Sequence, residues 1–167
     1  MGNSAVRVVL SKKAYGQIED SMIAAKNDFE VGGVLLGYRI FGCCFVAAAT
    51  VPAETSARSR VSFILDGDWH TACAADLMRS LRRKLRILGI WHSHICAGAV
   101  FSEQDRQSNT QFAASCNGAL SMLVQLTPLR EVRMTVYDIS ADGRERLCRI
   151  LRHGKRRPLR KALPNES

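Results

Sequence analysis

Residues 86–94 read RILGIWHSH, and after seven further residues positions 102–105 read SEQD. The apolar run 86–91 predicts a β-strand that leads directly into His92 and His94. Side chains two residues apart on an extended segment point to the same face, so both imidazoles aim at one point. Ser102 predicts the N-cap of a helix through about Ser115, which places Asp105 on its first turn.

Two imidazoles and a carboxylate are the ligands that a catalytic zinc ion uses, with its fourth position left for water. Calcium and magnesium prefer all-oxygen shells and suit this set less well. The plainer alternative is that His92, His94 and Asp105 are ordinary polar residues at a strand–loop–helix junction. Because His92, His94, Ser102 and Asp105 all fit one geometry, we predict one zinc ion per chain, with a bound catalytic water.

Hydrolysis of an amide also needs a general base, which later protonates the leaving amine. Glu30 is the best candidate because it is not used as a ligand. It opens the segment EVGGVLLG, residues 30–37, a predicted strand entry whose glycines allow close backbone approach. The alternative for Glu30 is a surface glutamate at a helix–strand junction.

Further elements follow from apolar periodicity and turn residues. Strands are expected at 6–10, 31–40, 43–51, 61–65, 119–126 and 132–139, and a last strand or helix at 146–151. Ser11 caps a helix to about Lys26, with Tyr15, Ile18, Met22 and Ala25 on its apolar stripe. Asp66 or Asp68 caps a helix to about Leu85, whose buried stripe is Ala72, Ala75, Leu77, Met78, Leu81 and Leu85. This order predicts one α/β or α+β domain with a mixed sheet flanked by helices.

Composition restricts the class of protein. The chain has 167 residues, of which 47% are hydrophobic and 23% charged, as expected for one globular domain. No run approaches the ~20 apolar residues of a membrane span, and we see no signal peptide. Six cysteines occur without a Cys-x-x-Cys pair, so a structural zinc cluster is not expected. A chain of this length needs no disulfides, and without an export signal we expect reduced core thiols and a cytoplasmic location.

The net charge of +9 is uneven, because residues 152–161 read RHGKRRPLRK. Such a block can bind nucleic acid or an acidic partner. The plainer alternative is a solvated, flexible tail over residues 153–167. The tail lacks aromatic residues, which weakens a role in stacking on single strands.

The combination of EVGGVLLG with HSH, seven residues and SEQD resembles the JAMM (MPN+) zinc metalloproteases over about residues 5–150. The resemblance implies a single MPN/JAB domain over residues 1–152, with a cytidine-deaminase-like fold. It implies that His92, His94 and Asp105 bind zinc and that Glu30 is the acid/base. It assigns Ser102 to stabilising the oxyanion, a role worth about 3 kcal/mol where such donors have been measured. Members cleave isopeptide or peptide bonds after the C-terminus of ubiquitin or a ubiquitin-like protein.

Two positions depart from the family pattern, which has proline after the second histidine and often before the serine. Here Ile95 and Phe101 stand at these positions. Neither is a ligand, but the loop between them lines the expected site and affects substrate preference. Cys96 in this loop is either a small apolar side chain or a thiolate able to occupy the open position of the zinc.

The short chain is similar to prokaryotic JAB peptidases, which commonly accompany E1- and E2-like proteins. These include deconjugases of CBASS anti-phage operons, which free a cGAS-like nucleotidyltransferase from its conjugates, and those of bacterial ubiquitin-like operons. The resulting hypothesis is a deubiquitinase-like zinc isopeptidase in antiviral defence. One alternative is a sulfur-carrier-protein peptidase. Another is a RadC-like nucleic-acid-associated module that uses the basic tail, although that branch usually shows His-Asn-His.

Overall fold

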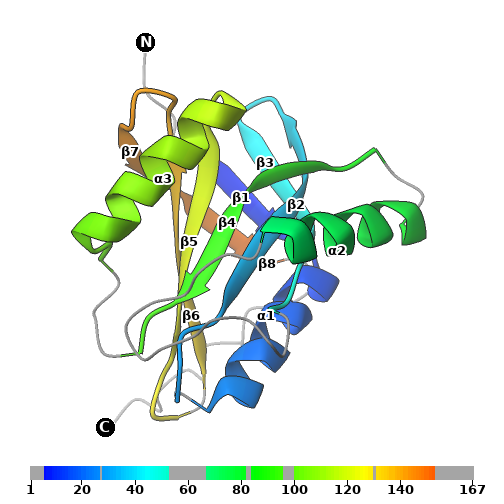
Figure 1. The fold of residues 1–167 in the computed structure, drawn as a ribbon, viewed down its shortest axis with the longest axis vertical. Helices are drawn as coiled ribbons and strands as arrows, with labels where there is room; N and C mark the ends of the chain where they lie inside the picture. The colour runs from blue at the N-terminus through cyan, green and yellow to red at the C-terminus, as the bar shows by residue number, and fades with distance from the viewer. Residues whose placement is uncertain are drawn as a thin grey trace, which may run out of the picture.

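The structure is a computed structural model that describes residues 6–26, 28–52, 67–81, 84–95, 100–129 and 131–152. Its helices are α1 (Lys12–Ala25), α2 (Gly67–Ser80) and α3 (Glu103–Cys116) (Figure 1). Its strands are β1 (Arg7–Leu10), β2 (Gly32–Ile40), β3 (Cys43–Ala49), β4 (Arg86–Ser93), β5 (Ala119–Leu126), β6 (Val132–Ile139), β7 (Glu145–Leu147) and β8 (Arg149–Arg152). The strand predicted at 61–65 lies outside the described residues.

The described strands form one eight-stranded sheet in the order β7-β6-β5-β4-β2-β3-β1-β8. Strand β1 runs parallel to β3 and β8, and β4 runs parallel to β5. The other pairs are antiparallel. The sheet is therefore mixed and flanked by helices, as the sequence predicted.

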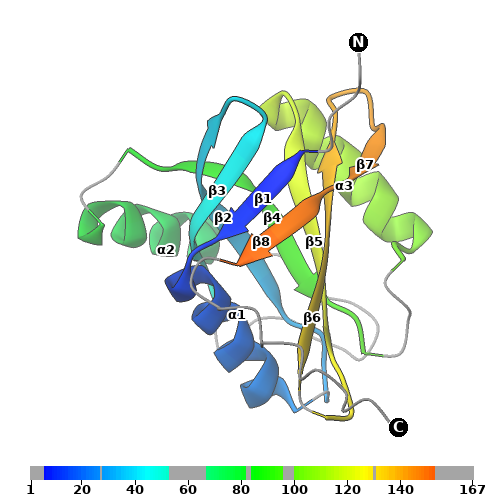
Figure 2. The ribbon, with the colours of Figure 1, turned by 180° about the vertical axis from the view of Figure 1, so that it is seen from behind.

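The sheet curls until its two edges meet (Figure 2). Strands β7 and β8 lie at opposite ends of the strand order, yet only Cys148 separates them in the chain. The Cys148 N–H donates to Val136 O of β6 at 2.8 Å, so the β8 side lies against β6. An ion pair of 2.9 Å between Arg39 of β2 and Asp138 of β6 also spans the curl.

The helices cover both faces of the sheet (Figures 1 and 2). Helix α1 lies on one face, where its stripe of Ala14, Ile18, Met22 and Ala25 joins the largest core cluster. Helices α2 and α3 lie on the opposite face, each with its own apolar cluster. The predicted stripe of α1 is confirmed, except that Tyr15 is only partly buried. Ser11 caps α1 as predicted, accepting a hydrogen bond from the Ala14 N–H.

The predicted buried stripe of α2 was correct in part: Leu77, Met78, Leu81 and Leu85 pack in the apolar cluster beneath the helix. Ala72 is exposed, and the fully buried positions are His70 and Ala74. The helix begins at Gly67, so Asp68 lies within the first turn, and it ends at Ser80, so Leu85 is buried outside it. A polar His70 is accommodated in the core because Thr50 Oγ1 lies 2.6 Å from its Nδ1.

The C-terminal element was predicted as one strand or helix at 146–151 and is instead two strands, β7 and β8. They separate because β7 pairs with β6 while β8 pairs with β1. Within the described ranges, Cys43, Cys44, Cys73, Cys116 and Cys148 are free thiols. Of the helices in this part of the chain, none is long and apolar enough to span a membrane.

Candidate metal centre

The site lies where the parallel strands β4 and β5 end and α3 begins. The two strands pair from Gly89↔Leu120 to Ser93↔Val124, and the His94 N–H then donates to Val124 O at 3.0 Å. A Cβ at Gly89 would lie 1.8 Å from Leu120 O, so only glycine permits this approach. The carboxyl end of a strand beside a helix N-terminus is a common ligand position in mixed α/β sheets.

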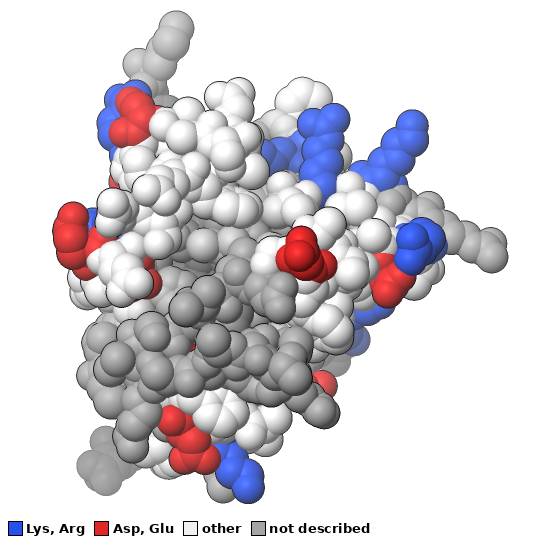
Figure 3. All heavy atoms as spheres, in the orientation of Figure 1, with Lys and Arg blue, Asp and Glu red and all other residues white. Residues whose placement is uncertain are grey.

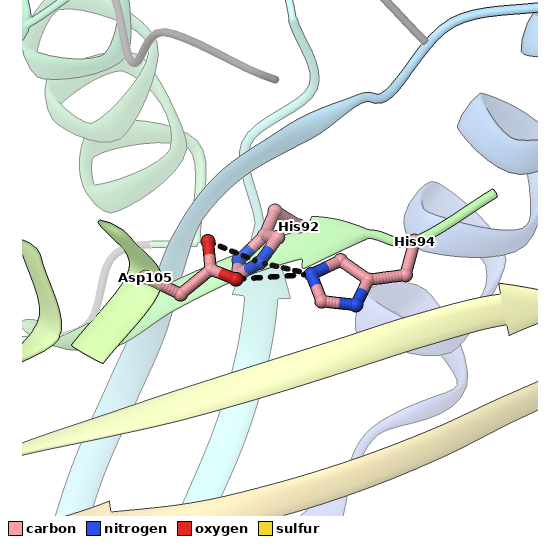
Figure 4. A group of neighbouring side chains, drawn as sticks. All are labelled: His92, His94 and Asp105. Atoms are coloured by element: carbon pink, nitrogen blue, oxygen red, sulfur yellow. Dashed lines mark hydrogen bonds and ion pairs between the residues drawn. The ribbon is translucent and has the colours of Figure 1, made fainter. Parts of the chain in front are cut away.

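Three side chains meet at this point (Figure 4). The Nε2 atoms of His92 and His94 lie 3.1 Å apart, and each lies 3.2 Å from a carboxylate oxygen of Asp105. All three ligand atoms lie within 4.8 Å of one another. Tetrahedral zinc with Zn–N bonds of about 2.0–2.1 Å places two ligand nitrogens about 3.4 Å apart. The spacing therefore fits zinc with only small adjustments.

Asp105 is held by the start of α3. The Ser102 N–H and Oγ donate to its Oδ2 at 2.8 and 2.7 Å, and the Asp105 N–H donates back to Ser102 Oγ at 3.1 Å. This capping box fixes the carboxylate toward the two histidines. Burial acts to raise the pKa of Asp105, but hydrogen bonds with His92, His94 and Ser102 outweigh it and hold the pKa well below its usual range.

Ser102 is thus a positioning partner of Asp105 in this structure, and its hydroxyl donates a hydrogen bond to the carboxylate. The predicted cap and the predicted place of Asp105 on the first turn are both confirmed. The oxyanion role that the family resemblance gives to Ser102 stays a prediction.

Glu30 is buried beside the triad, with 7% of its surface exposed. Burial raises the pKa of its carboxyl, while His94 and His92 act in the opposite direction. Glu30 enters the site because β2 begins with Gly32 opposite His92. It is a buried neighbour of the histidines and not the surface glutamate of the alternative interpretation.

Ser93, between the two histidines, positions Glu30 through hydrogen bonds to the adjacent Val31. Its Oγ accepts a hydrogen bond from the Val31 N–H at 2.9 Å, and its N–H donates to Val31 O at 2.7 Å. Both bonds act on the residue that follows Glu30. The role of Ser93 could not be predicted from the sequence, because only the pairing of β2 with β4 brings it to position 31.

Gly33 is required by a buried polar network behind the site. A Cβ there would lie 2.3 Å from Thr50 O and 2.9 Å from Trp91 Nε1. Thr50 O accepts a hydrogen bond from Trp91 Nε1 at 3.0 Å, and Thr50 Oγ1 accepts one from the Val34 N–H at 2.8 Å. The predicted close backbone approach is confirmed, and its partners are Thr50 and Trp91.

Phe101, which replaces a usual family proline, is buried and packs against Tyr137 and His92, with ring centroids 4.9 and 6.3 Å away. Ile95 is half-buried. Residues 96–99 of this loop, including Cys96, lie outside the described residues, so the proposed thiolate role of Cys96 stays a prediction.

A family model described as prokaryotic homologs of the JAB domain matches residues 21–136. This match covers more than half of the chain and includes His92, His94, Asp105 and Glu30. The chain belongs to this family of prokaryotic JAB-domain proteins.

No curated protein matches the chain. Among solved structures, it is similar to the solution structure of protein DSY2949 from Desulfitobacterium hafniense, with a TM-score of 0.67 and 20% identity. The similarity covers 89% of this chain and 94% of that chain. At this identity, the likeness shows the fold alone.

Proposed function

We propose that this protein is a zinc-dependent peptidase or isopeptidase that cleaves after the C-terminus of a ubiquitin-like protein or a conjugated protein. The observation that carries the proposal is the buried Glu30 carboxyl beside the His92–His94–Asp105 set. A metal site that only stabilises the fold closes its coordination with four protein ligands. Three ligands with a separate buried carboxyl suit hydrolysis instead.

In this proposal His92, His94 and Asp105 hold the zinc, which when bound supplies Lewis acidity to water and to the scissile carbonyl. Glu30 accepts the proton of the attacking water and returns it to the leaving amine. A carboxyl with a raised pKa suits both transfers, because it gains and releases a proton nearer to neutral pH. Ser102 keeps Asp105 oriented through the capping box.

Two exposed apolar side chains offer a contact for an extended substrate tail. Val51 follows β3 at the end of the sheet where β2 meets His92, and Trp69 Nε1 donates to Val51 O at 3.0 Å. Both side chains are exposed although they are apolar. They could give a peptide tail an apolar contact at this end of the sheet.

The test is a cleavage assay on purified protein loaded with zinc. The substrate is a ubiquitin-like protein that carries a fusion partner at its C-terminus. We expect one zinc ion per chain and release of the fusion partner at the end of the modifier. Full zinc loading without cleavage of any ubiquitin-like or sulfur-carrier fusion would overturn the hydrolase.

The same assay separates the narrower proposals. Cleavage of a conjugated nucleotidyltransferase supports a role in anti-phage defence with E1- and E2-like partners, whereas cleavage of a sulfur-carrier tail supports a biosynthetic peptidase.

The nucleic-acid alternative gains no support from the face of α2 and α3. There the described Lys, Arg, Asp and Glu side chains are scattered and mixed (Figure 3).

Ser93→Ala is expected to lower kcat on the order of 10- to 100-fold, because a small displacement of a catalytic group has an effect of that size. The variant removes the acceptor of the Val31 N–H and so loosens Glu30. Zinc affinity should change little, since both histidines remain. Ser115→Ala, an exposed serine on α3, is the matched control. An unchanged kcat for Ser93→Ala would show that the position of Glu30 does not depend on the hydrogen bond between Val31 and Ser93.

A further inference from the structure

A buried polar pair joins α3 to β5 inside an otherwise apolar interface. Ser121 Oγ donates to Asn109 Oδ1 at 2.8 Å, and the two residues are only 1% and 3% exposed. The surrounding cluster consists of apolar side chains: Phe101, Ala113, Ala119, Leu123, Ile139, Phe112 and Tyr137.

Stability does not explain this pair. Asn109 Nδ2 is buried and has no hydrogen-bond partner within the part of the chain that the structure describes. A buried amide that uses only part of its hydrogen-bonding capacity is less favourable than an apolar pair of similar size. Leucine and alanine at these positions would fit the character of the neighbouring side chains.

The pair lies close to the metal ligands along both α3 and β5. Asn109 follows Asp105 by four residues, so both project from the same face of α3. Ser121 precedes Leu123 by two residues on β5, and Leu123 pairs with His92. Ser121 and Leu123 therefore share one face of the sheet, the face that α3 covers.

Asp105 is the one ligand of the set that comes from α3, while both histidines follow from β4. Its distance to them therefore depends on where α3 lies along the sheet. Apolar contacts are non-directional and tolerate a shift of the helix. A hydrogen bond between fixed atoms is satisfied in one register only.

We propose that the Asn109–Ser121 hydrogen bond is a positioning contact that fixes the register of α3 on β5 and so holds Asp105 at the metal. The inference rests on the proposed metal binding. Asn109 and Ser121 act through Asp105 and do not touch the metal or the substrate.

The test replaces the pair by apolar residues in the variant Asn109→Leu/Ser121→Ala. Zinc affinity is measured by competition with a chromophoric chelator, and the melting temperature is measured on metal-free protein. We expect zinc binding to weaken about tenfold, at the lower end of the effect of removing support from a metal ligand. The melting temperature should stay equal or rise, because the unpartnered amide is removed. The cobalt-substituted variant should also show altered absorption bands, since its carboxylate ligand is displaced.

The control Ala113→Gly lies in the same helix and the same cluster, four residues after Asn109. It should lower the melting temperature while zinc affinity remains within twofold of wild type. The single variant Ser121→Ala provides the same zinc measurement if the double variant does not fold. Wild-type zinc affinity in the folded apolar variant overturns this inference alone. A wild-type protein that binds no zinc overturns it together with the proposed function.

Discussion

Glu30→Gln is expected to lower kcat/KM for the fusion substrate about a thousandfold, within the range that a general acid/base contributes. Glutamine keeps the size of the side chain but cannot accept a proton from water. Zinc content should remain one ion per chain, because Glu30 does not belong to the His92–His94–Asp105 set. The measurements are steady-state cleavage and metal analysis of the same preparation.

The exposed Glu131, on the turn between β5 and β6, provides a matched control as Glu131→Gln. This variant should cleave at the wild-type rate. An active Glu30→Gln protein with full zinc content would remove Glu30 from the mechanism and leave the metal site intact.

The raised pKa of Glu30 also predicts an effect on stability. In metal-free protein the fold favours the protonated carboxyl, so the free energy of unfolding falls as pH rises through the raised pKa. Glutamine has no such dependence. Metal-free Glu30→Gln should therefore be more stable than wild type at neutral pH. This difference should disappear in acid, where Glu30 is protonated in the folded and in the unfolded chain alike. Denaturant unfolding at pH 4 and pH 7 measures it.

The sequence predicted the centre of the site because its signals are local. The alternation of His92 and His94 on a strand and the cap at Ser102 depend on residues close in the chain. The strand at 119–126 was likewise predicted from a largely apolar local segment, and β5 occupies these residues.

Features that depend on distant partners could not be predicted in this way. Histidine in an apolar helix face gives no sign of burial until Thr50 is placed beside it, and so His70 was missed. The curl of the sheet depends on β8 pairing with β1 from the opposite end of the chain. Asn109 was missed for the same reason, since only the packing of α3 on β5 brings Ser121 to it.

Asp105→Asn is expected to weaken zinc binding by at least about a hundredfold, more than the loss of a supporting residue, because the metal loses its charged ligand. Ser102 remains the N-cap, and the amide oxygen of asparagine can still accept a hydrogen bond from the Ser102 N–H, so α3 should persist. The measurement is chelator competition on metal-free protein. The exposed Asp142, on the turn before β7, supplies the control Asp142→Asn, which should bind zinc as wild type does.

The stability of metal-free Asp105→Asn should move in the direction opposite to Glu30→Gln. The pKa of Asp105 is held well below its usual range, so its carboxylate stabilises the fold at pH values above the pKa of the unfolded chain. That contribution is present at neutral pH and is lost as pH falls. Asp105→Asn should therefore be less stable than wild type at pH 7, and the deficit should shrink in acid. Two carboxyls in one site then have opposite effects on stability, because the fold favours the ionised form of Asp105 and the protonated form of Glu30. Equal zinc affinity for wild type and Asp105→Asn would contradict the ligand assignment, whatever the unfolding curves show.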